Sequence, residues 1–575
     1  MLKNELLLER IMKIKRLKIL SSFRSLPANY EIVFNGSSNE SSAVSPICFV
    51  GLNGSGKSNV LELITEIFYF LENFEKPHRE SEKNFKTKFG FEIEYELPRL
   101  YVMGARFPWN ELNKALENTK VNPIIKISKE LGEFPRVSVL TNKETLNLEA
   151  SNFDIIQTVL PARIVAYSSG MNELLSNSFI KMDFKYFEDL KLINRSDSLD
   201  MNRMFYLSYD SNKFIAISNF IFDSEDYDMT NFIKGQKATD FGGIDLSNLK
   251  RELSIENIRS FAINFKLRKN SHEKDYLPPE LNIALDNLKK CATFINESSR
   301  KTKKENFLEL ELVFWVNKST KAAFRQYFKT AYDLFRAFYF FQLLNTELIS
   351  QETRKSIMAS KTGAFENLSD ELPKHESSNL IFRISNITFY KKNQSILEYR
   401  KLSDGEHQMI QVFGSLLLMD TTGSLFLFDE PDTHFNPDWR SKFVTIANNS
   451  IDKEREQEVI LTTHSPYIVS DCKKENVYIF HKNYNGEVVK PTSPEINTFG
   501  TSTSILSEIV FGKEDTISEL SKRKIEKIRN MPLNSLENIQ KAKEASRVLG
   551  ESVEKVILFK DLISKERELK NDSNL

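Results

Sequence analysis

The chain has 575 residues, of which 40% are hydrophobic, and this length allows roughly two to four domains with sizeable cores. Lys plus Arg and Asp plus Glu both number 79, so the global charge gives no indication of nucleic-acid or membrane binding. The three cysteines, Cys48, Cys291 and Cys472, lie far apart, which suits a reducing compartment and excludes a disulfide framework or a C-x-x-C metal site.

The N-terminal segment, MLKNELLLERIMKIKRLKIL, carries charges throughout its apolar positions, unlike a secretory signal. The longest apolar runs, such as LFRAFYFFQLL at 334–344, are too short to span a bilayer and include Arg336. We therefore expect a soluble, cytoplasmic protein without membrane contacts.

Several short patterns predict strands in the first part of the chain. Alternation predicts strands at 14–26 and 30–35, and further strands are expected at 89–97 and 162–169. PICFV at 46–50 has the continuous apolar pattern of a buried strand, and a strongly apolar helix follows it after a glycine-rich turn. This arrangement favours an α/β fold class.

The pattern changes from about 175 to 380, where polar strands and helices are mixed and one long helix is expected at 321–350. Alternating strand and helix patterns return near 380, and a charged helical tail begins at about 514. The sequence predicts four parts, which are the two halves of an α/β head at 1–175 and 381–512, a mainly helical or mixed inserted domain at 176–380, and a helical tail at 513–575.

Residues 51–58 read GLNGSGKS and match the phosphate-loop pattern G-x-x-x-x-G-K-[ST] between a strand and a helix. Gly54 and Gly56 allow backbone N–H groups to turn toward an anion, and the helix N-terminus adds partial positive charge. Lys57 can reach the β- and γ-phosphates, and the Ser58 hydroxyl can ligate Mg²⁺. A glycine-rich turn with a solvated lysine is the alternative, but the flanking strand and helix favour ATP or GTP. The predicted binding residues are Asn53, Gly54, Ser55, Gly56, Lys57, Ser58 and Asn59.

Two later strands end in polar side chains. SLFLFDE at 424–430 would place Asp429 and Glu430 at the carboxyl edge of a parallel sheet, with Asp429 in the Mg²⁺ shell and Glu430 polarising the attacking water. EVILTTHSPYIV at 458–469 would bring His464 within reach of a γ-phosphate or of that water. Solvated acids and a structural histidine are the alternative, and the phosphate loop favours catalysis.

Residues 402–408, LSDGEHQ, open an apolar helix with a Leu-Ser-x-Gly stretch suited to phosphate binding. With GLNGSGKS, LFLFDEPDTHFNP and TTHSP, this stretch resembles the ordered motifs of the ATP-binding-cassette ATPases. The likeness is to the RecF/SMC-like branch, which includes OLD-type defence ATPases, and it covers about 1–175 and 380–512. In that family the signature motif caps the γ-phosphate of ATP held by the other subunit. The resemblance thus implies a homodimer or higher oligomer in which Ser403, Asp404 and Gly405 grip the partner's ATP.

The signature departs from the family's commonest form at two positions, with Asp404 in place of glycine and Glu406 in place of glutamine. The family's Q-loop is expected at the end of the strand in ARIVAYSSGMNE, with Ser168, Asn172 or Glu173 in that role.

Other features narrow the choice among members of the RecF/SMC-like branch. The insertion has neither sustained heptads nor C-x-x-C, which argues against coiled-coil arms or a zinc hook. The tail has no D-x-D pair, so the chain is not expected to be itself a nuclease. Three segments resemble restriction-associated and Septu-type, PtuA-like ATPases, some of which are encoded with retrons: YSSGMNE (167–173), DEPDTHFNPDWR (429–440) and INTFGTSTSILSEIVFG (496–512). That resemblance implies bacterial antiphage defence with a separately encoded effector of the HNH nuclease type.

The sequence also offers candidate sites for direct nucleic-acid binding. Basic runs occur at 265–270, 300–304 and 521–529, but solvated faces balanced by abundant acids are the more ordinary interpretation. Two function classes stay open: a regulatory ATPase that controls an effector, with retron RNA or DNA or phage DNA as possible ligands, and a RecF-like ATPase acting on DNA in repair or replication.

Overall fold

The computed structural model describes residues 12–35, 46–74, 90–104, 109–117, 121–142, 144–148, 153–170, 174–192, 203–227, 237–269, 277–301, 306–359, 367–419, 421–451, 457–513 and 517–572. The chain forms two compact units, residues 1–499 and residues 500–575. Among the described residues, no helix combines the length and apolar character needed to cross a membrane.

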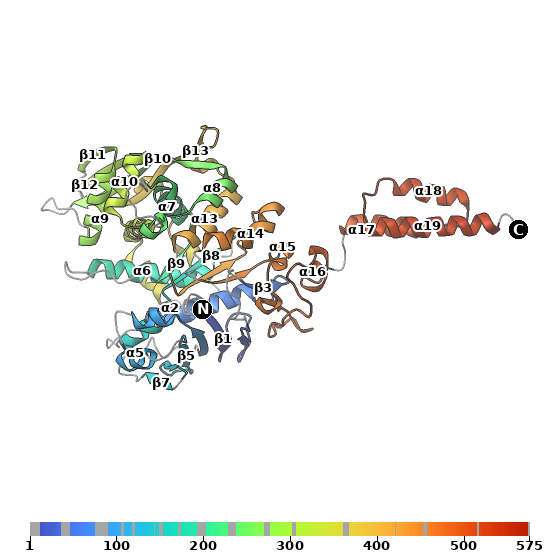
Figure 1. The fold of residues 1–575 in the computed structure, drawn as a ribbon, viewed down its shortest axis with the longest axis horizontal. Coiled ribbons are helices and arrows are strands. Elements are labelled where there is room, and N and C mark those ends of the chain that lie inside the picture. Colours follow the sequence, from blue (N-terminus) through green and yellow to red (C-terminus); the bar gives the residue numbers. More distant parts are fainter. Residues whose placement is uncertain are drawn as a thin grey trace. The chain divides into compact units, whose positions relative to one another are not determined.

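A six-stranded parallel sheet forms the centre of the first unit (Figure 1). Its spatial order is β17 (Val477–Phe480), β3 (Ile47–Gly51), β16 (Glu458–Thr462), β15 (Ser424–Asp429), β8 (Arg163–Ser168) and β9 (Met204–Tyr206). Strands β3 and β16 are buried along their whole length, as expected for a parallel sheet that is covered on both faces. The sheet brings together strands that lie far apart in the sequence, because β3 pairs with β16 and β17.

The strand register places several carboxyl-terminal residues at one edge of this sheet. Asp429 is opposite Thr462 on one side and Ser168 on the other, and Thr462 is opposite Phe49. The loop after β3 leads into α2 (Lys57–Glu72), which starts at this edge. The edge is where ligands bind in open parallel sheets.

A second, antiparallel sheet is built from N-terminal residues. Its order is β2 (Glu31–Val33), β1 (Lys13–Ile19), β4 (Phe91–Glu96), β5 (Ile124–Lys129), β6 (Arg136–Leu140) and β7 (Thr145–Leu148), and two short helices, α4 (Arg99–Met103) and α5 (Asn110–Glu117), interrupt it. Strands β4 and β5 alternate buried and partly exposed residues, the pattern of a sheet with one covered face. The sequence predicted the first three of these strands, and β5 to β7 are additional.

The insertion is mixed, with a five-stranded antiparallel sheet and several helices. The sheet order is β11 (Phe294–Lys301), β12 (Asn306–Trp315), β10 (Ile255–Lys269), β13 (Phe382–Lys391) and β14 (Ile396–Glu398). The helices are α6 (Asn177–Leu192), α7 (Tyr209–Ile221), α8 (Ser247–Leu253), α9 (Pro279–Cys291), α10 (Lys318–Tyr327), α11 (Ala331–Leu343) and α12 (Gln351–Met358). Strands β13 and β14 follow the predicted domain boundary at 380, yet they join the sheet of the insertion, because β13 pairs with β10.

The prediction of one helix at 321–350 is wrong, because the chain forms α10 and α11 with a break between them. Thr330 starts α11 with a capping box, in which its hydroxyl accepts from the Asp333 backbone N–H and the Asp333 carboxylate accepts from the Thr330 N–H. This reciprocal capping satisfies backbone donors that a continuous helix would have used.

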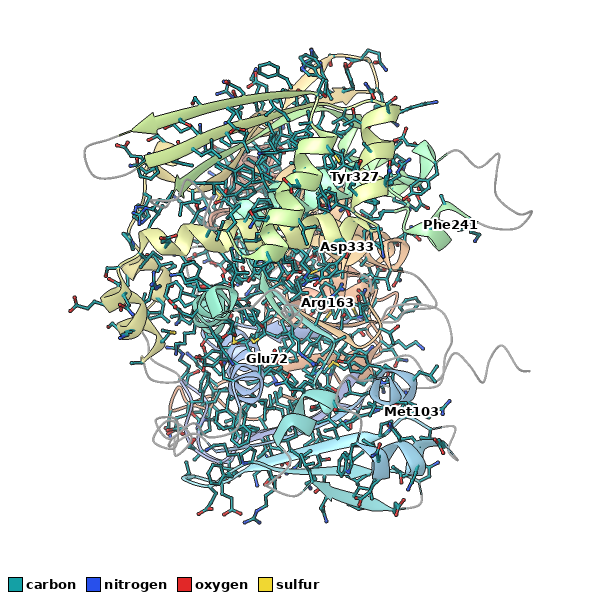
Figure 2. The ribbon with its side chains drawn as sticks, turned by 90° about the vertical axis from the view of Figure 1, so that its left-hand side faces the viewer. Glu72, Met103, Arg163, Phe241, Tyr327 and Asp333 are labelled. Carbon is teal, nitrogen blue, oxygen red and sulfur yellow. The ribbon has the colours of Figure 1, made fainter. Side chains whose placement is uncertain are left out.

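Figure 2 shows the layers of the first unit. Arg163, at the start of β8, lies between Asp333 of the insertion above and Glu72 at the end of α2 below, and Met103 marks the N-terminal layer. The Arg163 guanidinium lies 3.5 Å from the ring centroid of Tyr332, a contact that joins the parallel sheet to the insertion.

Helix α13 (Asp404–Leu418) is tied to the insertion by buried amides. Asn212 and Asn219 of α7 donate to the carbonyls of His407 and Gly414, each at 3.0 Å. A Cβ at Gly414 would fall 2.7 Å from Ile215, so only glycine permits this approach. The insertion and the helix that follows it therefore pack as one body. Helices α14 (Pro437–Ser450) and α15 (Pro466–Ser470) follow β15 and β16.

The second unit contains α16 (Thr503–Ile509), α17 (Glu519–Arg529), α18 (Leu536–Ser546) and α19 (Val553–Asp572). Its small apolar core consists of Ile525, Ile528, Ala542, Leu558 and Leu562. The α/β fold class predicted from the sequence is therefore confirmed, with a mixed insertion and a helical C-terminal part.

Candidate functional site

The loop between β3 and α2 has a backbone that requires glycine. Gly51, Gly54 and Gly56 have φ values of +130°, +72° and +97°, in the region that favours glycine. At Gly51 a Cβ would also fall 2.3 Å from the Phe480 carbonyl oxygen of β17. Two of these glycines belong to the fixed positions of the phosphate-loop pattern, and the structure gives them the conformations that this pattern needs.

Lys57 opens α2 and is buried. Its Nζ donates to the carbonyl oxygens of Gly51 and Leu52, each at 3.0 Å, so the side chain lies along the loop. Burial lowers the pKa of Lys57, while the carboxylates of Glu430 and Asp429 act in the opposite direction. A bound phosphate would add negative charge beside this ammonium group and favour its charged form.

Asp429 is the last residue of β15 and connects two strands to α2. Its Oδ1 accepts from the Ser58 hydroxyl at 3.0 Å and from the Thr462 hydroxyl at 2.6 Å. Burial raises the pKa of Asp429, and these two hydrogen bonds act in the opposite direction. The Ser58 hydroxyl and the Asp429 carboxylate thus form a hydrogen bond across the sheet edge.

The residues at this edge fit a magnesium ion. Mg²⁺ prefers oxygen ligands and is commonly held by one or two protein groups, with substrate phosphates and water supplying the rest. Ser58 and Asp429 provide such oxygens 3.0 Å apart. Within the described ranges no group of three or more His, Cys, Asp or Glu side chains is arranged to hold a metal ion, so a site made wholly of such protein ligands is not found there.

Glu430 and His464 face each other at the mouth of the site. Their side chains are 39% and 38% exposed, and His464 Nε2 lies 3.4 Å from Glu430 Oε1. The hydrogen bond from His464 is the main cause that lowers the pKa of Glu430. An ionised carboxylate at the surface of a nucleotide site can accept a proton from water.

Glu430 has an unusual backbone. Its φ of +50° lies in the left-handed region, which costs a non-glycine residue on the order of 1–3 kcal/mol and is found most often at functional sites. The Glu430 N–H donates to the Thr462 hydroxyl at 2.9 Å, and the Thr433 hydroxyl donates to the Glu430 carbonyl at 2.9 Å. These contacts hold the turn that aims the carboxylate.

Thr462 belongs to the candidate site through its contacts, and the sequence interpretation did not include it. Its hydroxyl donates to Asp429 and accepts from the N–H of Glu430, so it orients both acids. The available signal was the polar pair Thr462-Thr463 at the end of an apolar strand. Thr463 does the same for the next acid, because its hydroxyl donates to the buried Asp432 at 2.9 Å.

The signature motif forms the start of α13. Ser403 is the N-cap, its hydroxyl accepts from the Glu406 N–H, and the Glu406 carboxylate accepts from the Ser403 N–H at 2.7 Å. Ser403 and Asp404 are exposed, whereas Gly405 is buried. Glu406, a departure from the commonest signature, therefore completes a capping box.

The remaining predicted residues have different environments. Asn53 and Gly54 are exposed, Ser55 is buried, and Asn59 donates to the Ser25 hydroxyl at 2.6 Å. Of the Q-loop candidates, Ser168 ends β8 opposite Asp429. Asn172 and Glu173 lie outside the described residues.

Comparison with known proteins gives matches over parts of the chain. Residues 193–470 match the family model described as "AAA domain, putative AbiEii toxin, Type IV TA system". This range contains the signature, the acidic strand and His464, and the phosphate loop precedes it.

Two curated relatives are similar over shorter stretches. Protein ea59 of Escherichia phage lambda is 32% identical over 132 residues, which are 23% of this chain and 24% of that protein. The retron Vc95 probable ATPase of Vibrio cholerae serotype O1 biovar El Tor is 26% identical over 170 residues, 27% of this chain and 32% of that protein. The matches thus span about a quarter to a third of the length of these relatives.

Two solved structures also align with the chain. The SMC head domain from Thermotoga maritima has a TM-score of 0.29 and 10% identity, covering 84% of this chain and 100% of that one. The Smc head domain with a coiled coil and joint from Pyrococcus yayanosii has a TM-score of 0.29 and 12% identity, covering 84% and 97%. Residues 193–470 thus resemble an AAA domain, and part of the chain resembles a probable ATPase.

Proposed function

We propose that the chain binds ATP with Mg²⁺ at Gly51–Ser58 and hydrolyses it with Glu430 as the general base, in a site completed by a second copy. The observation that carries this proposal is the continuous set of contacts from Ser58 through Asp429 and Thr462 to Glu430. These contacts connect Ser58, the last residue of the phosphate-loop motif, to the partly exposed carboxylate of Glu430. Such an arrangement suits the transfer of a phosphoryl group to water.

Each residue has a defined role in this proposal. Lys57 neutralises the β- and γ-phosphates, and Ser58 with Asp429 would hold Mg²⁺, which when bound would neutralise further phosphate charge. Glu430 orients the attacking water and accepts its proton. His464 keeps Glu430 ionised through its hydrogen bond, and in this proposal it also reaches the γ-phosphate or the attacking water.

The test compares binding and hydrolysis of ATP in two variants. Lys57→Ala removes the cation from the loop and should abolish ATP binding. Glu430→Gln keeps the shape of the side chain, so it should bind ATP like the wild type and hydrolyse it about 10²–10⁴-fold more slowly. Phosphate release and equilibrium nucleotide binding measure the two effects. Hydrolysis at the native rate by Glu430→Gln would show that the base is assigned wrongly.

The biological role that we propose is control of a separately encoded effector, of the HNH nuclease type, in bacterial antiphage defence of the Septu or retron kind. Its support is the similarity to the retron Vc95 probable ATPase and the toxin named in the matched family description. In this role a homodimer, or a higher oligomer, closes around ATP and changes how it holds the effector. Retron RNA or DNA, or phage DNA, is the proposed trigger ligand.

The role is tested in cells that carry the chain together with its neighbouring genes. Phage plating should fall with the wild-type set and return to the empty-vector level with Lys57→Ala. Two results together would favour the RecF-like alternative. Phage would plate normally on cells with the wild-type genes, and cells with Lys57→Ala would become sensitive to DNA damage.

A further inference from the structure

Gln408 lies in the second turn of α13 and joins three separate parts of the site. Its side chain is buried, with only 2% exposed, although both ends are polar. The Oε1 accepts from the His434 backbone N–H at 3.0 Å, and the Nε2 donates to the Tyr167 hydroxyl at 3.1 Å. One amide therefore links the signature helix to the segment after β15 and to the end of β8.

The backbone of the signature helix touches the same segment. A Cβ at Gly405 would fall 2.8 Å from the His434 carbonyl oxygen and 3.2 Å from the Trp439 ring, so glycine is required for this approach. The N–H of His434 is held by Gln408 and its C=O lies against Gly405. The start of α13 thus fixes His434 on two sides.

His434 lies close in sequence to the general base proposed above. The turn that begins at Glu430 is closed by Thr433, whose N–H donates to the Glu430 carbonyl at 3.3 Å. Glu430 has a left-handed backbone, and a conformation of this kind persists only when the surroundings fix it. The anchor at His434 supplies part of that constraint.

We infer that Gln408 is a positioning residue, which orients Glu430 for water activation by holding His434 and Tyr167 against the start of α13. The inference rests on the proposed function. A buried amide with both ends bonded is costly to break, because each lost partner leaves a desolvated polar group. Movement of the signature helix would therefore reach Glu430 through this side chain, within the same subunit.

The chain offers a matched control one turn further along the same helix. Gln411 is also buried and donates to the backbone carbonyl of Ser208 at 3.0 Å, on the side of the insertion. Gln408→Met and Gln411→Met each remove a buried amide and keep the approximate volume. Only Gln408→Met removes the anchor on the segment that contains His434.

The first measurement is steady-state ATP hydrolysis. Gln408→Met should lower kcat by about 10- to 100-fold with an unchanged KM, since misplacement of a catalytic group by about 1 Å has effects of this size. Gln411→Met should keep kcat within about two-fold of the wild type. Tyr167→Phe, which removes one hydroxyl and little packing, should give a smaller fall than Gln408→Met.

The second measurement does not depend on activity. Amide hydrogen exchange of residues 431–436 should be faster in Gln408→Met than in the wild type and unchanged in Gln411→Met. Unchanged exchange there, or equal losses of kcat in both glutamine variants, would overturn the positioning role. An inactive wild type with the expected exchange pattern would instead overturn the proposed function and leave the anchoring contact established.

Discussion

Burial and single hydrogen bonds together set the pKa values of the two acids at the end of β15. Thr462 contacts both Asp429 and Glu430, and His464 contacts Glu430 from the loop that follows the neighbouring strand β16. Asp429 and Glu430 are neighbours in sequence, yet the pKa of Asp429 is raised by burial and that of Glu430 is lowered by its hydrogen bonds. The two carboxyl groups therefore suit different tasks, Asp429 as a buried ligand and Glu430 as an ionised base.

The first residue-scale prediction concerns the pH dependence of hydrolysis. A lowered pKa keeps Glu430 ionised to lower pH, so removing the main cause should move the acidic limb of the kcat profile upward. His464→Ala should show this shift, in addition to any loss of rate. Thr433→Val removes the weakest of the causes and should shift the limb less. Equal acidic limbs in the wild type and His464→Ala would contradict the assignment.

The second residue-scale prediction concerns stability and Asp183, a partly buried acid in the insertion. The Tyr339 hydroxyl donates to the Asp183 carboxyl, and burial raises the pKa of Asp183 from 3.8 to about 7. Because the folded state binds this proton more tightly, the contribution to stability is complete below about pH 4 and is lost as pH rises through about 7.

Asp183→Asn should remove this dependence. Between pH 4 and pH 8, the free energy of unfolding of the wild type should fall by roughly a few kcal/mol relative to that of Asp183→Asn. Denaturant unfolding at several pH values measures it. Parallel stability curves for the two proteins would show that Asp183 does not titrate as stated.

At the scale of elements, the signature helix starts with a capping box formed by Ser403 and Glu406. Glu406→Ala leaves the Ser403 N–H without its partner and should lower the free energy of unfolding by about 0.5–2 kcal/mol. Glu406→Gln keeps a side-chain acceptor at this position and should stay within about 0.5 kcal/mol of the wild type. A Glu406→Ala variant as stable as Glu406→Gln would mean that the cap contributes nothing in solution.

Elements with strong local patterns could be predicted from the sequence, and others could not. Strands β3, β15 and β16 are continuous apolar runs that end in polar groups, so their role at the sheet edge was readable. Strands β10 and β12 mix charged and apolar residues, and their pairing depends on partners elsewhere in the chain. The break between α10 and α11 needed only Thr330 and Asp333, a local signal that the apolar run around it obscured.

In the candidate site, too, some residues could be predicted from local motifs and others could not. Gly51–Ser58 and Asp429-Glu430 follow from motifs whose spacing carries the chemistry. Thr462 and Gln408 act through hydrogen bonds to residues distant in sequence, and these exist only once the sheet register and the packing of α13 are set. No local pattern distinguishes such residues from ordinary polar positions.

At the scale of the whole molecule, the proposal requires two copies. If the signature acts on the partner's ATP, Ser403→Arg should bind ATP at its own loop and hydrolyse it poorly. Each ATP site would then combine the phosphate loop of one copy with the signature of the other copy. In a mixed dimer with Lys57→Ala, one such composite site carries both substitutions and the other carries neither. Random mixing should then restore roughly a quarter of the wild-type activity.

A second pair of variants, mixed in the same way, shows whether mixing alone restores hydrolysis. Lys57→Ala with Glu430→Gln damages the same half of each site, so every composite site in that mixture carries at least one lesion. Activity should stay absent in this pair and return in the first. Co-assembled Ser403→Arg and Lys57→Ala that remain inactive would mean that residues 402–408 do not act across subunits.

The strand order of the central sheet has a consequence for biosynthesis. β3 ends at Gly51, but its two neighbours, β16 and β17, begin at Glu458 and Val477. The ribosome therefore releases an apolar strand whose partners are the last of the sheet to be translated. At about 5–20 residues per second, that strand waits on the order of 20–80 s before it can pair. β3 therefore stays without its sheet neighbours during this interval, and the ATP site proposed above cannot be complete before β16, which carries Thr462, has emerged.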